Sequence, residues 1–259
     1  MSDSEYGGFF AEFYDILHSN LDDVEVYKEL ADQYGPHILE VGSGTGRILL
    51  PLAREGFEVT GLELNEDILE ICRKKIEEES HGVVENVELI EGDMRDFDLD
   101  KKFDLIIAPC NVICHLIKRS DLKQTLSCFR DHLFEDGVLV IDNSMPDVES
   151  MVENNGEEQM LEFTHPENGR KIVNKFTPSY DFVEQIERDS IVIKEFDGET
   201  KTREAEEEEK LTFYFPKELR EILRSEGFEI FEERGSLNKE APIDENSDEM
   251  VFLCTPSNR

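Results

Sequence analysis

The chain has 259 residues, a length that suits one α/β domain with an insertion better than two independent domains. Acidic residues outnumber basic ones 62 to 27, and the formal charge of −35 disfavours a nucleic-acid partner because such a surface repels phosphate backbones. The five cysteines include no CxxC pair, so reduced thiols are expected rather than a structural zinc site.

The N-terminal sequence MSDSEYGGFF has no basic region followed by an apolar core, as a secretory signal would have. The most apolar run, residues 105–117, is shorter than the ~20 residues needed to span a bilayer. We therefore expect a cytoplasmic protein with no membrane partner. The acidic surface indicates either a salt-rich (halophilic) cytoplasm, where ions screen the self-repulsion, or an ordinary acidic protein.

Apolar spacing predicts one or two helices over residues 9–34. Strands and helices then alternate, which is typical of a parallel sheet covered on both faces. Asn65 and Ser120 are the expected N-caps of the second and third of these helices, and Gly56 is the expected C-cap of the first. The strands are predicted at residues 37–41, 57–64, 87–93, 102–110 and 137–143, and the helices at 47–56, 65–80 and 120–133.

The pattern changes after the fifth strand. Residues 158–215 contain β-rich pieces joined by turn-like sequences, which indicate an antiparallel insertion of hairpins. A helix at 216–227, with Pro216 in its first turn, and a closing pair of strands follow. The domains are therefore predicted as 1–157 (N-terminal helices and α/β core), 158–215 (insertion) and 216–259 (last helix and closing strands).

The stretch HILEVGSGTGRI places Gly42, Gly44 and Gly46 directly after the first strand. A strand, a glycine loop and a helix together form a cradle for nucleotides, because bare backbone allows close approach. The spacing GxGxG differs from the GxGxxG of dinucleotide folds, since Arg47 stands in the next position. Glu63, at the end of the second strand, is placed to accept both hydroxyls of a ribose.

These residues resemble the class I S-adenosylmethionine-dependent methyltransferases. The resemblance covers most of the chain: EVGSGTG after the first strand, Glu63 after the second, GDM at 92–94 after the third, and LIIAPCNV at the fourth. It implies a Rossmann-like seven-stranded sheet with an antiparallel insertion between strand five and the last helix. It also implies S-adenosylmethionine as the cofactor and a small-molecule methyl acceptor as the partner.

The resemblance carries roles over to individual positions. The glycine loop is expected to hold the amino-acid end of the cofactor, Glu63 the ribose, and Asp93 the adenine amine, with Met94 donating a backbone N–H. The whole expected cofactor-binding set is Glu40, Gly42, Ser43, Gly44, Thr45, Gly46, Arg47, Glu63, Leu64, Asp93, Met94 and Cys110.

The segments AEFYDILH, GDMRDFDL and NVICHL look like those of amino-sugar N,N-dimethyltransferases. The NVICHL segment, the acidic end of strand five and the hairpin insertion are also similar to glycine and sarcosine N-methyltransferases. By position these relatives imply that Tyr14 and His115 are catalytic, His115 as a proton acceptor from the amine. Asn111, Asp142 and Asn143 are the expected acceptor pocket.

The resemblance favours an N-methyltransferase of a small-molecule amine. Glycine, sarcosine or dimethylglycine, methylated towards betaine, would fit a salt-rich cytoplasm. The alternatives are an amino sugar or another metabolite with an N or O acceptor, a non-catalytic protein that binds the same cofactor, and an NAD-dependent oxidoreductase. The oligomeric state is open between monomer and homodimer.

Two further features bear on the acceptor. Asp142 and Asn143 resemble part of the metal triad of catechol-type O-methyltransferases, but Pro109, Cys110 and Asn111 replace the required acid after strand four, so no metal is expected. An acceptor carboxylate would need an arginine or backbone N–H groups in the insertion, where Arg170 and Arg188 are candidate arginines.

The salt hypothesis predicts that the denaturation midpoint rises between low salt and molar KCl. Salt screens the repulsion among 62 acidic side chains, and repulsion between exposed charges destabilises the compact state. Urea unfolding followed by circular dichroism at several KCl concentrations measures this. An unchanged midpoint would contradict salt adaptation.

Overall fold

The computed structural model describes Phe13 and residues 23–165, 168–238 and 241–257. The chain divides into two compact units. The core unit comprises Leu21–Met145 and Tyr214–Arg259, and the sheet unit comprises Met1–Asn20 and Pro146–Phe213. Tyr14, one of the two expected catalytic residues, lies outside the described residues.

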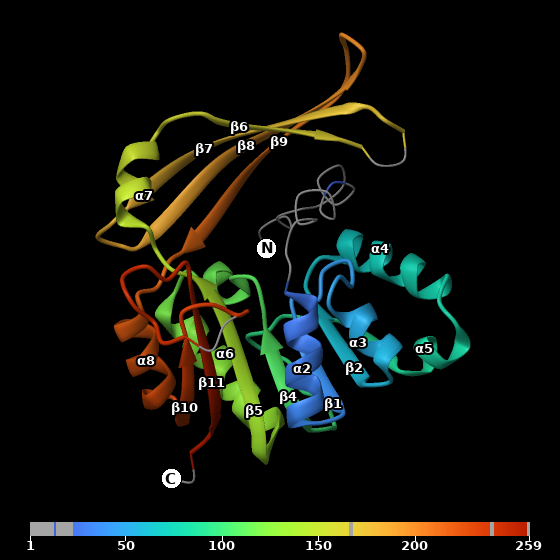
Figure 1. Cartoon of the computed structure of the whole chain (residues 1–259), viewed down its shortest axis with the longest axis vertical. Helices are drawn as coiled ribbons and strands as arrows, with labels where there is room; N and C mark the ends of the chain where they lie inside the picture. Colours follow the sequence, from blue (N-terminus) through green and yellow to red (C-terminus); the bar gives the residue numbers. More distant parts are fainter. Residues whose placement is uncertain (1–12, 14–22, 166–167, 239–240, 258–259) are drawn as a thin grey trace. The chain divides into compact units, whose positions relative to one another are not determined.

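The core unit is built on a seven-stranded sheet in the order β10-β11-β5-β4-β1-β2-β3 (Figure 1). Strands β1 to β5 run parallel, while β11 is antiparallel to both β5 and β10. This confirms the predicted Rossmann-like seven-stranded fold. The strands are β1 (His37–Val41), β2 (Glu58–Glu63), β3 (Val87–Glu91), β4 (Phe103–Ala108), β5 (Leu133–Ser144), β10 (Phe228–Arg234) and β11 (Glu249–Pro256).

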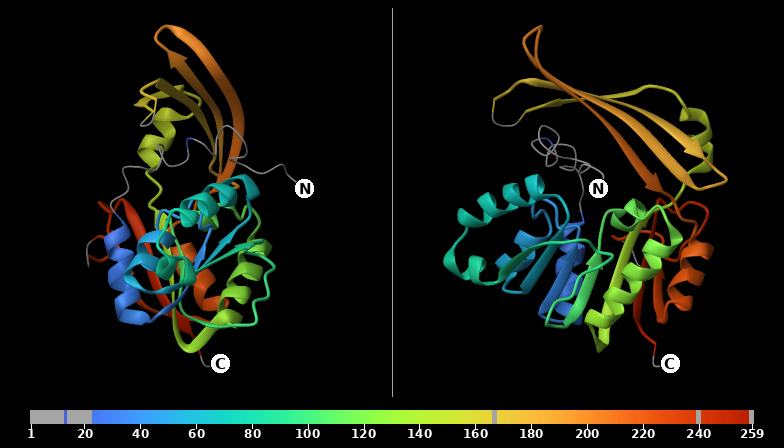
Figure 2. Two further views of the ribbon diagram at one scale, coloured as in Figure 1. Left: turned by 90° about the vertical axis from the view of Figure 1, so that its right-hand side faces the viewer. Right: turned by 180° about the vertical axis from the view of Figure 1, so that it is seen from behind.

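Helices cover both faces of this sheet (Figure 2). One face carries α2 and α3, and the other carries α6 and α8. The core packs aliphatic residues of β1, β4 and β5 against α2 and α3. The helices of the core unit are α2 (Val24–Tyr34), α3 (Leu49–Glu55), α4 (Glu66–Glu77), α5 (His81–Glu85), the 3₁₀ helix η1 (Val112–His115), α6 (Arg119–His132) and α8 (Pro216–Ser225).

The structure settles the three predicted helix caps. The Asn65 side chain accepts hydrogen bonds from the amides of Asp67 and Ile68, which confirms it as the N-cap of α4. Gly56 is the left-handed C-cap of α3, with φ 99°. Ser120 is not an N-cap, because α6 begins one residue earlier, after Lys118. The Ser120 hydroxyl bonds to the neighbouring Asp121 carboxylate instead.

Several predicted boundaries differ from the structure by a few residues, and two of these differences have local reasons. Helix α3 begins at Leu49 rather than at residue 47, because the turn that follows the glycines uses two more residues. Strand β5 begins at Leu133 rather than at residue 137, since Leu133 already pairs with Phe103 of β4. The three exposed residues that follow Leu133, two of them acidic, concealed this extension. The short elements α5 and η1 were not predicted.

The sheet unit is a four-stranded antiparallel sheet in the order β6-β7-β8-β9, as the turn-rich sequence predicted. Phe13 packs with Ile172 and Ile193 into a small apolar cluster of this unit. The glutamate run 204–209 lies in the edge strand β9. The elements are α7 (Val148–Asn154), β6 (Gln159–Thr164), β7 (Lys171–Asp181), β8 (Ile186–Asp197) and β9 (Thr200–Thr212). Among the helices that the structure describes, none is long and apolar enough to cross a membrane.

His132 ties α6 to the segment before β4. Its Nδ1 lies 2.8 Å from the Cys128 carbonyl and its Nε2 accepts the Leu99 amide at 2.9 Å, so Nδ1 serves as the donor and Nε2 as the acceptor. The buried ring also lies 4.5 Å from that of Phe97.

We expect His132→Phe to lower the free energy of unfolding by about 1–3 kcal/mol, because it keeps the ring volume but leaves the Leu99 amide unpaired. Urea unfolding at neutral pH measures this. His81→Phe is the control, since the His81 side chain is 87% exposed and is expected to change stability little. Equal effects of the two substitutions would contradict the assigned role.

Candidate active site

The parallel strands β1, β2, β3, β4 and β5 all end at one edge of the core sheet, and the loops that follow them carry the predicted site. In parallel sheets ligands bind at this edge, where the strand order reverses. The reversal here lies between β1 and its neighbour β4. The loops are joined by backbone hydrogen bonds, from Gly42 to the Leu62 carbonyl (2.8 Å) and from Gly92 to the Glu63 carbonyl (2.9 Å).

The three loop glycines all have positive φ, 67° at Gly42, 56° at Gly44 and 85° at Gly46. Side chains are disfavoured in this conformation, and two of the positions are also crowded. A Cβ at Gly42 would lie 2.4 Å from Cγ2 of Val112, and one at Gly46 would lie 2.8 Å from Sγ of Cys72. The loop therefore keeps its shape only with bare backbone.

The strand-two carboxylate Glu63 holds this loop in place. Its Oε2 accepts the Gly44 amide at 3.0 Å, and its Oε1 accepts the Asn65 amide at 2.8 Å. Each carboxylate oxygen has a second lone pair, so the half-buried group keeps capacity for two hydroxyl donors. This geometry fits the predicted role of binding a ribose.

Glu40, the last but one residue of β1, is a buried acid behind the loop. Only 2% of it is exposed, and Oε2 has no hydrogen-bond partner among the described residues. Burial raises the pKa of this carboxyl well above its ordinary value, while the nearby Arg47 cation opposes the rise. A buried acceptor without a donor suits a ligand that brings a cation or an N–H group.

Arg47 bridges the loop to α2 and to the segment after β4. Its guanidinium forms a bidentate salt bridge with Asp23, in which Nη2 lies 2.8 Å from Oδ2. The same Nη2 lies 3.1 Å from Sγ of Cys110. Burial raises the pKa of the Cys110 thiol to about 12, so the thiol is neutral at physiological pH and fills space rather than reacting. Arg47, predicted to bind cofactor, thus also has a structural partner.

Cys110 and Asn111 form an elbow after β4, in which both residues have positive φ, 53° and 63°. Asp142, near the end of β5, accepts the Cys110 amide on Oδ2 at 3.3 Å and the Asn111 amide on its carbonyl at 3.1 Å. Asn111 also exchanges two hydrogen bonds with Ser144, of 2.6 and 3.0 Å. The predicted residues Cys110, Asn111 and Asp142 therefore form one connected structure.

Asp142 lies in a nearly closed environment. Burial raises the pKa of its carboxyl to about 6, and the nearby Glu249 and Asp23 carboxylates add to the rise. The hydroxyl of Tyr27 on α2 donates to Oδ2 at 3.1 Å and, like the Cys110 amide, opposes it. Asp142 is thus an acid that exchanges its proton near neutral pH.

Asp93, expected to bind the adenine amine, follows β3 and is paired with Arg95. The Arg95 Nε lies 2.9 Å from both carboxylate oxygens, and the Arg95 amide lies 2.9 Å from Oδ1. Arg95 lowers the pKa of Asp93 below its usual value. A second contact, 3.4 Å to Asp121 of α6, ties this loop to the helix. Asp93 stays ionised and oriented, as an acceptor for an amine must be.

The remaining predicted residues take different positions. Ser43 and Thr45 are buried within the loop, Met94 is half-buried and Leu64 is 60% exposed. Asn143 is buried with its amide nitrogen 2.9 Å from Sγ of Cys114. His115 is the half-buried last residue of η1, beyond the elbow.

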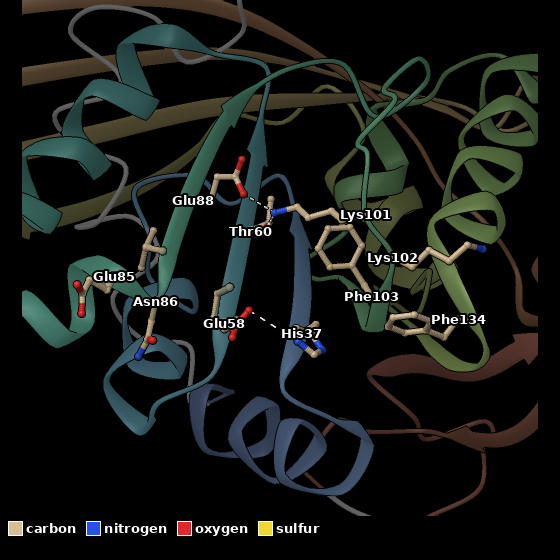
Figure 3. A pocket seen from close by; sticks show the side chains of 12 residues that line it. His37, Glu58, Thr60, Glu85, Asn86, Glu88, Lys101, Lys102, Phe103 and Phe134 are labelled. Atoms are coloured by element: carbon tan, nitrogen blue, oxygen red, sulfur yellow. Dashed lines mark hydrogen bonds and ion pairs between the residues drawn. The ribbon is translucent and has the colours of Figure 1, made fainter.

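A depression of about 390 Å³ lies at the other end of the strands (Figure 3). Its polar side chains pair with one another: Lys101 contacts Glu88 and, at 2.7 Å, Thr60, while Nε2 of His37 lies 3.7 Å from Glu58. A ligand there would be a full strand length from the glycine loop. This depression is therefore separate from the candidate site.

Comparison with known proteins gives consistent matches. A methyltransferase-domain family model matches residues 38–137. The dTDP-3-amino-3,6-dideoxy-alpha-D-glucopyranose N,N-dimethyltransferase of Streptomyces fradiae is 32% identical over 148 residues, which cover 54% of each protein. The chain spans about half the length of the curated relatives that it matches.

Solved structures match over nearly the whole chain. The CcbJ methyltransferase from Streptomyces caelestis superposes with a TM-score of 0.85 at 20% identity, covering 99% of this chain and 100% of that one. CalS10, an amino pentose methyltransferase from Micromonospora echinaspora solved with bound SAM, superposes with a TM-score of 0.71 at 21% identity, covering 99% and 100%.

Residues 38–137 of the chain match a methyltransferase domain. Its fold is the class I S-adenosylmethionine-dependent methyltransferase fold, as the glycine loop and the strand-end acids predicted. S-adenosylmethionine, the predicted cofactor, is bound in two of the solved structures that the chain resembles. The site fits it: Oε2 of Glu40 is a buried acceptor without a partner among the described residues, and the glycine loop presents bare backbone.

Sequence reasoning missed the residues that support this site. Arg95, Asp23 and Tyr27 act through contacts between segments distant along the chain, and no spacing pattern identifies such contacts. Gly61 in β2 is different, because a glycine within a strand is itself a signal of close approach. A Cβ there would lie 2.6 Å from Cδ1 of Leu49 and 2.7 Å from Oγ of Ser43.

Gly61→Ala is expected to push Ser43 and the glycine loop away from β2, lowering the free energy of unfolding by about 1–3 kcal/mol through overpacking. It should also weaken the binding of S-adenosylhomocysteine, measured by calorimetry. Gly82→Ala in α5 is the matched control, since a Cβ there meets nothing within 4 Å. Wild-type affinity and stability in Gly61→Ala would show that the loop does not depend on this contact.

Proposed function

We propose that the protein transfers a methyl group from S-adenosylmethionine to the nitrogen of a small-molecule amine, and that an amino sugar is the best-supported acceptor class. The observation that carries the proposal is the joining of the glycine loop, Glu63 and the Cys110–Asn111 elbow at one sheet edge. The similarity to the Streptomyces fradiae amino-sugar N,N-dimethyltransferase supports the acceptor class.

In this proposal the loops divide the work of holding the cofactor. Gly42, Gly44 and Gly46 admit its amino-acid end, Glu63 accepts its ribose hydroxyls, and Asp93 accepts its adenine amine. Oε2 of Glu40, which has no hydrogen-bond partner among the described residues, suits an ammonium or a bridging water behind the loop. The bound cofactor supplies a methyl group on a positively charged sulfur, open to in-line attack.

In the methyl transfer, the residues of the chain position the acceptor amine and remove its proton. Holding the nucleophile close to the methyl carbon and on its axis accounts for much of the catalysis in such a displacement. An ammonium cannot attack until it has lost a proton, because its lone pair is otherwise occupied. We assign His115 as the proton acceptor, with Asn111, Asp142 and Asn143 around the acceptor pocket. Tyr14 completes the expected catalytic pair.

Two alternatives remain within reach of experiment. Methylation of glycine, sarcosine or dimethylglycine towards betaine has support only from the acidic composition and from the resemblance of the NVICHL segment, the end of strand five and the insertion to glycine and sarcosine N-methyltransferases. A non-catalytic protein that binds the same cofactor would use the same loops without His115. The sheet unit as an acceptor lid or a dimer contact also stays a prediction, as do a cytoplasmic location and a monomeric or homodimeric state.

The test is incubation of the full chain with trideuteromethyl S-adenosylmethionine and a panel of acceptors. The panel contains free and nucleotide-linked amino sugars, glycine, sarcosine and dimethylglycine, each in low salt and in molar KCl. We expect mass spectrometry to show one or two trideuteromethyl groups on an amino sugar. Transfer to glycine or sarcosine instead would establish the betaine alternative, and cofactor binding without any transfer would favour the non-catalytic one.

Glu63→Gln tests the cofactor assignment in the same assay. It keeps the shape of the side chain but removes one acceptor oxygen and the charge, so cofactor affinity should fall about 10–100-fold, the effect of losing hydrogen bonds to a charged group. Glu58→Gln at the opposite end of β2 is the matched control and should bind like wild type. Equal affinities of the two variants would remove Glu63 from the site.

A further inference from the structure

The elbow after β4 is held in a conformation that its own residues disfavour. Cys110 and Asn111 are consecutive, both have a Cβ, and both have left-handed φ values of 53° and 63°. Residues other than glycine keep such conformations only where surrounding contacts over-determine them. The contacts that fix this elbow are therefore part of the site's construction.

One face of α2 provides two of these contacts. Asp23, the N-cap of α2, and Tyr27 are four residues apart, so they lie on the same side of the helix. Asp23 holds Arg47 in the bidentate salt bridge. Sγ of Cys110 lies 3.6 Å from Asp23 and 3.1 Å from Arg47. Tyr27 donates to Asp142, whose Oδ2 also accepts the Cys110 amide. The helix thus holds both the side chain and the backbone of Cys110.

Packing alone does not explain the residues chosen. Tyr27 is fully buried, and burying its hydroxyl is unfavourable unless it is paired. Its partner Asp142 is itself a buried acid, so the pair places a charge where an apolar or amide side chain would fill the same volume. A phenylalanine with an asparagine would pack equally well. The hydroxyl and the carboxylate are needed where the Cys110 amide must be oriented.

We propose that Tyr27 and Asp23 are positioning residues, which fix the Cys110–Asn111 elbow through Asp142 and Arg47 and so set the shape of the cofactor pocket. The inference rests on the proposed function and extends it, because it assigns a role to a helix that lies before the first strand of the methyltransferase domain. Neither residue needs to touch the cofactor for this role.

The conformation of the elbow should depend on pH through Asp142. Asp142 faces Tyr27 and Asp23 from α2, Cys110 after β4, and Glu249 from β11, with Arg47 beyond Asp23. The pKa of Asp142 is raised by burial to about 6, and the Tyr27 hydrogen bond lowers it, so loss of the hydroxyl raises it further. Protonation removes the charge of the Asp142 carboxylate and so weakens its hydrogen bond to the Cys110 amide. The elbow should therefore become less rigid as the pH falls through that pKa.

Tyr27→Phe is the test variant, because it removes one hydroxyl and keeps the buried ring. Tyr34→Phe is the matched control: Tyr34 is the last residue of the same helix and bonds only to Gln33 among the contacts described for its hydroxyl. Backbone hydrogen exchange of the peptide covering residues 108–116 is measured first, without ligand. We expect faster exchange in Tyr27→Phe than in wild type or in Tyr34→Phe. Equal exchange in all three would overturn the proposal.

Binding of S-adenosylhomocysteine is then measured by calorimetry between pH 5 and pH 8. We expect the affinity of the wild type to fall below a pH of about 6, and this fall is called the acidic limb of the pH profile. We expect Tyr27→Phe to bind about ten-fold more weakly at pH 7, and its acidic limb to begin about one pH unit higher. Asp142→Asn, which keeps an acceptor oxygen but cannot titrate, should lose the acidic limb. The proposal would be overturned if Tyr27→Phe had the same affinity and the same acidic limb as Tyr34→Phe. A purely structural residue would leave the pH of the acidic limb unchanged.

The two measurements separate this proposal from the proposed function. A wild-type protein that binds no S-adenosylhomocysteine at any pH would contradict the proposed function, while the exchange experiment would still decide whether α2 holds the elbow.

Discussion

The parallel pairing of β1 with both β2 and β4 is the constraint on which the site depends. Parallel strands must all end at the same edge, and the connections from β1 and β4 then leave on opposite faces of the sheet. The glycine loop and the Cys110–Asn111 elbow therefore face each other although more than sixty residues separate them along the chain. Each further contact of the site, from Glu63 to Gly44 and from Arg47 to Cys110, lies within this arrangement.

Charge in the site is unbalanced towards the acids, and this has a stability cost. Glu40 and Asp142 have pKa values raised by burial, so each favours folding most when protonated, and that contribution is lost as the pH rises through the raised pKa, about 6 for Asp142. Arg47 compensates part of this charge through Asp23. A site that keeps acids at such a cost is suited to a positively charged ligand, and S-adenosylmethionine carries its charge on the sulfonium.

The sequence predicted those features that depend on local pattern. The alternation of apolar runs predicted the parallel strands, and Asn65 and Gly56 predicted helix ends. GSGTG with Glu63 predicted the sheet edge at which the cofactor is expected. Features that depend on distant contacts were not predictable. From the sequence, Tyr27 is indistinguishable from any core aromatic residue, and only the structure shows its hydroxyl 3.1 Å from Asp142. Arg95 likewise has the pattern of a surface cation, and only the structure shows that it pairs with Asp93. Ser120 shows that residue type alone does not fix a helix end. Serine is a favoured N-cap, but α6 already begins at Arg119, so Ser120 lies inside the helix.

The surface charge of −35 and the site chemistry act on different distance scales. At low salt the whole acidic surface attracts a cationic cofactor or amine and repels a nucleotide-linked acceptor, because the Debye length of about 10 Å at 0.1 M lets many charges act together. In molar salt that length falls to about 3 Å, so only groups in direct contact with a ligand still select it. Acceptor choice in a salt-rich cytoplasm would then rest on the few side chains around the elbow and His115. The net charge would govern solubility there, and an anionic amino-sugar nucleotide would be no less accessible to the site than glycine.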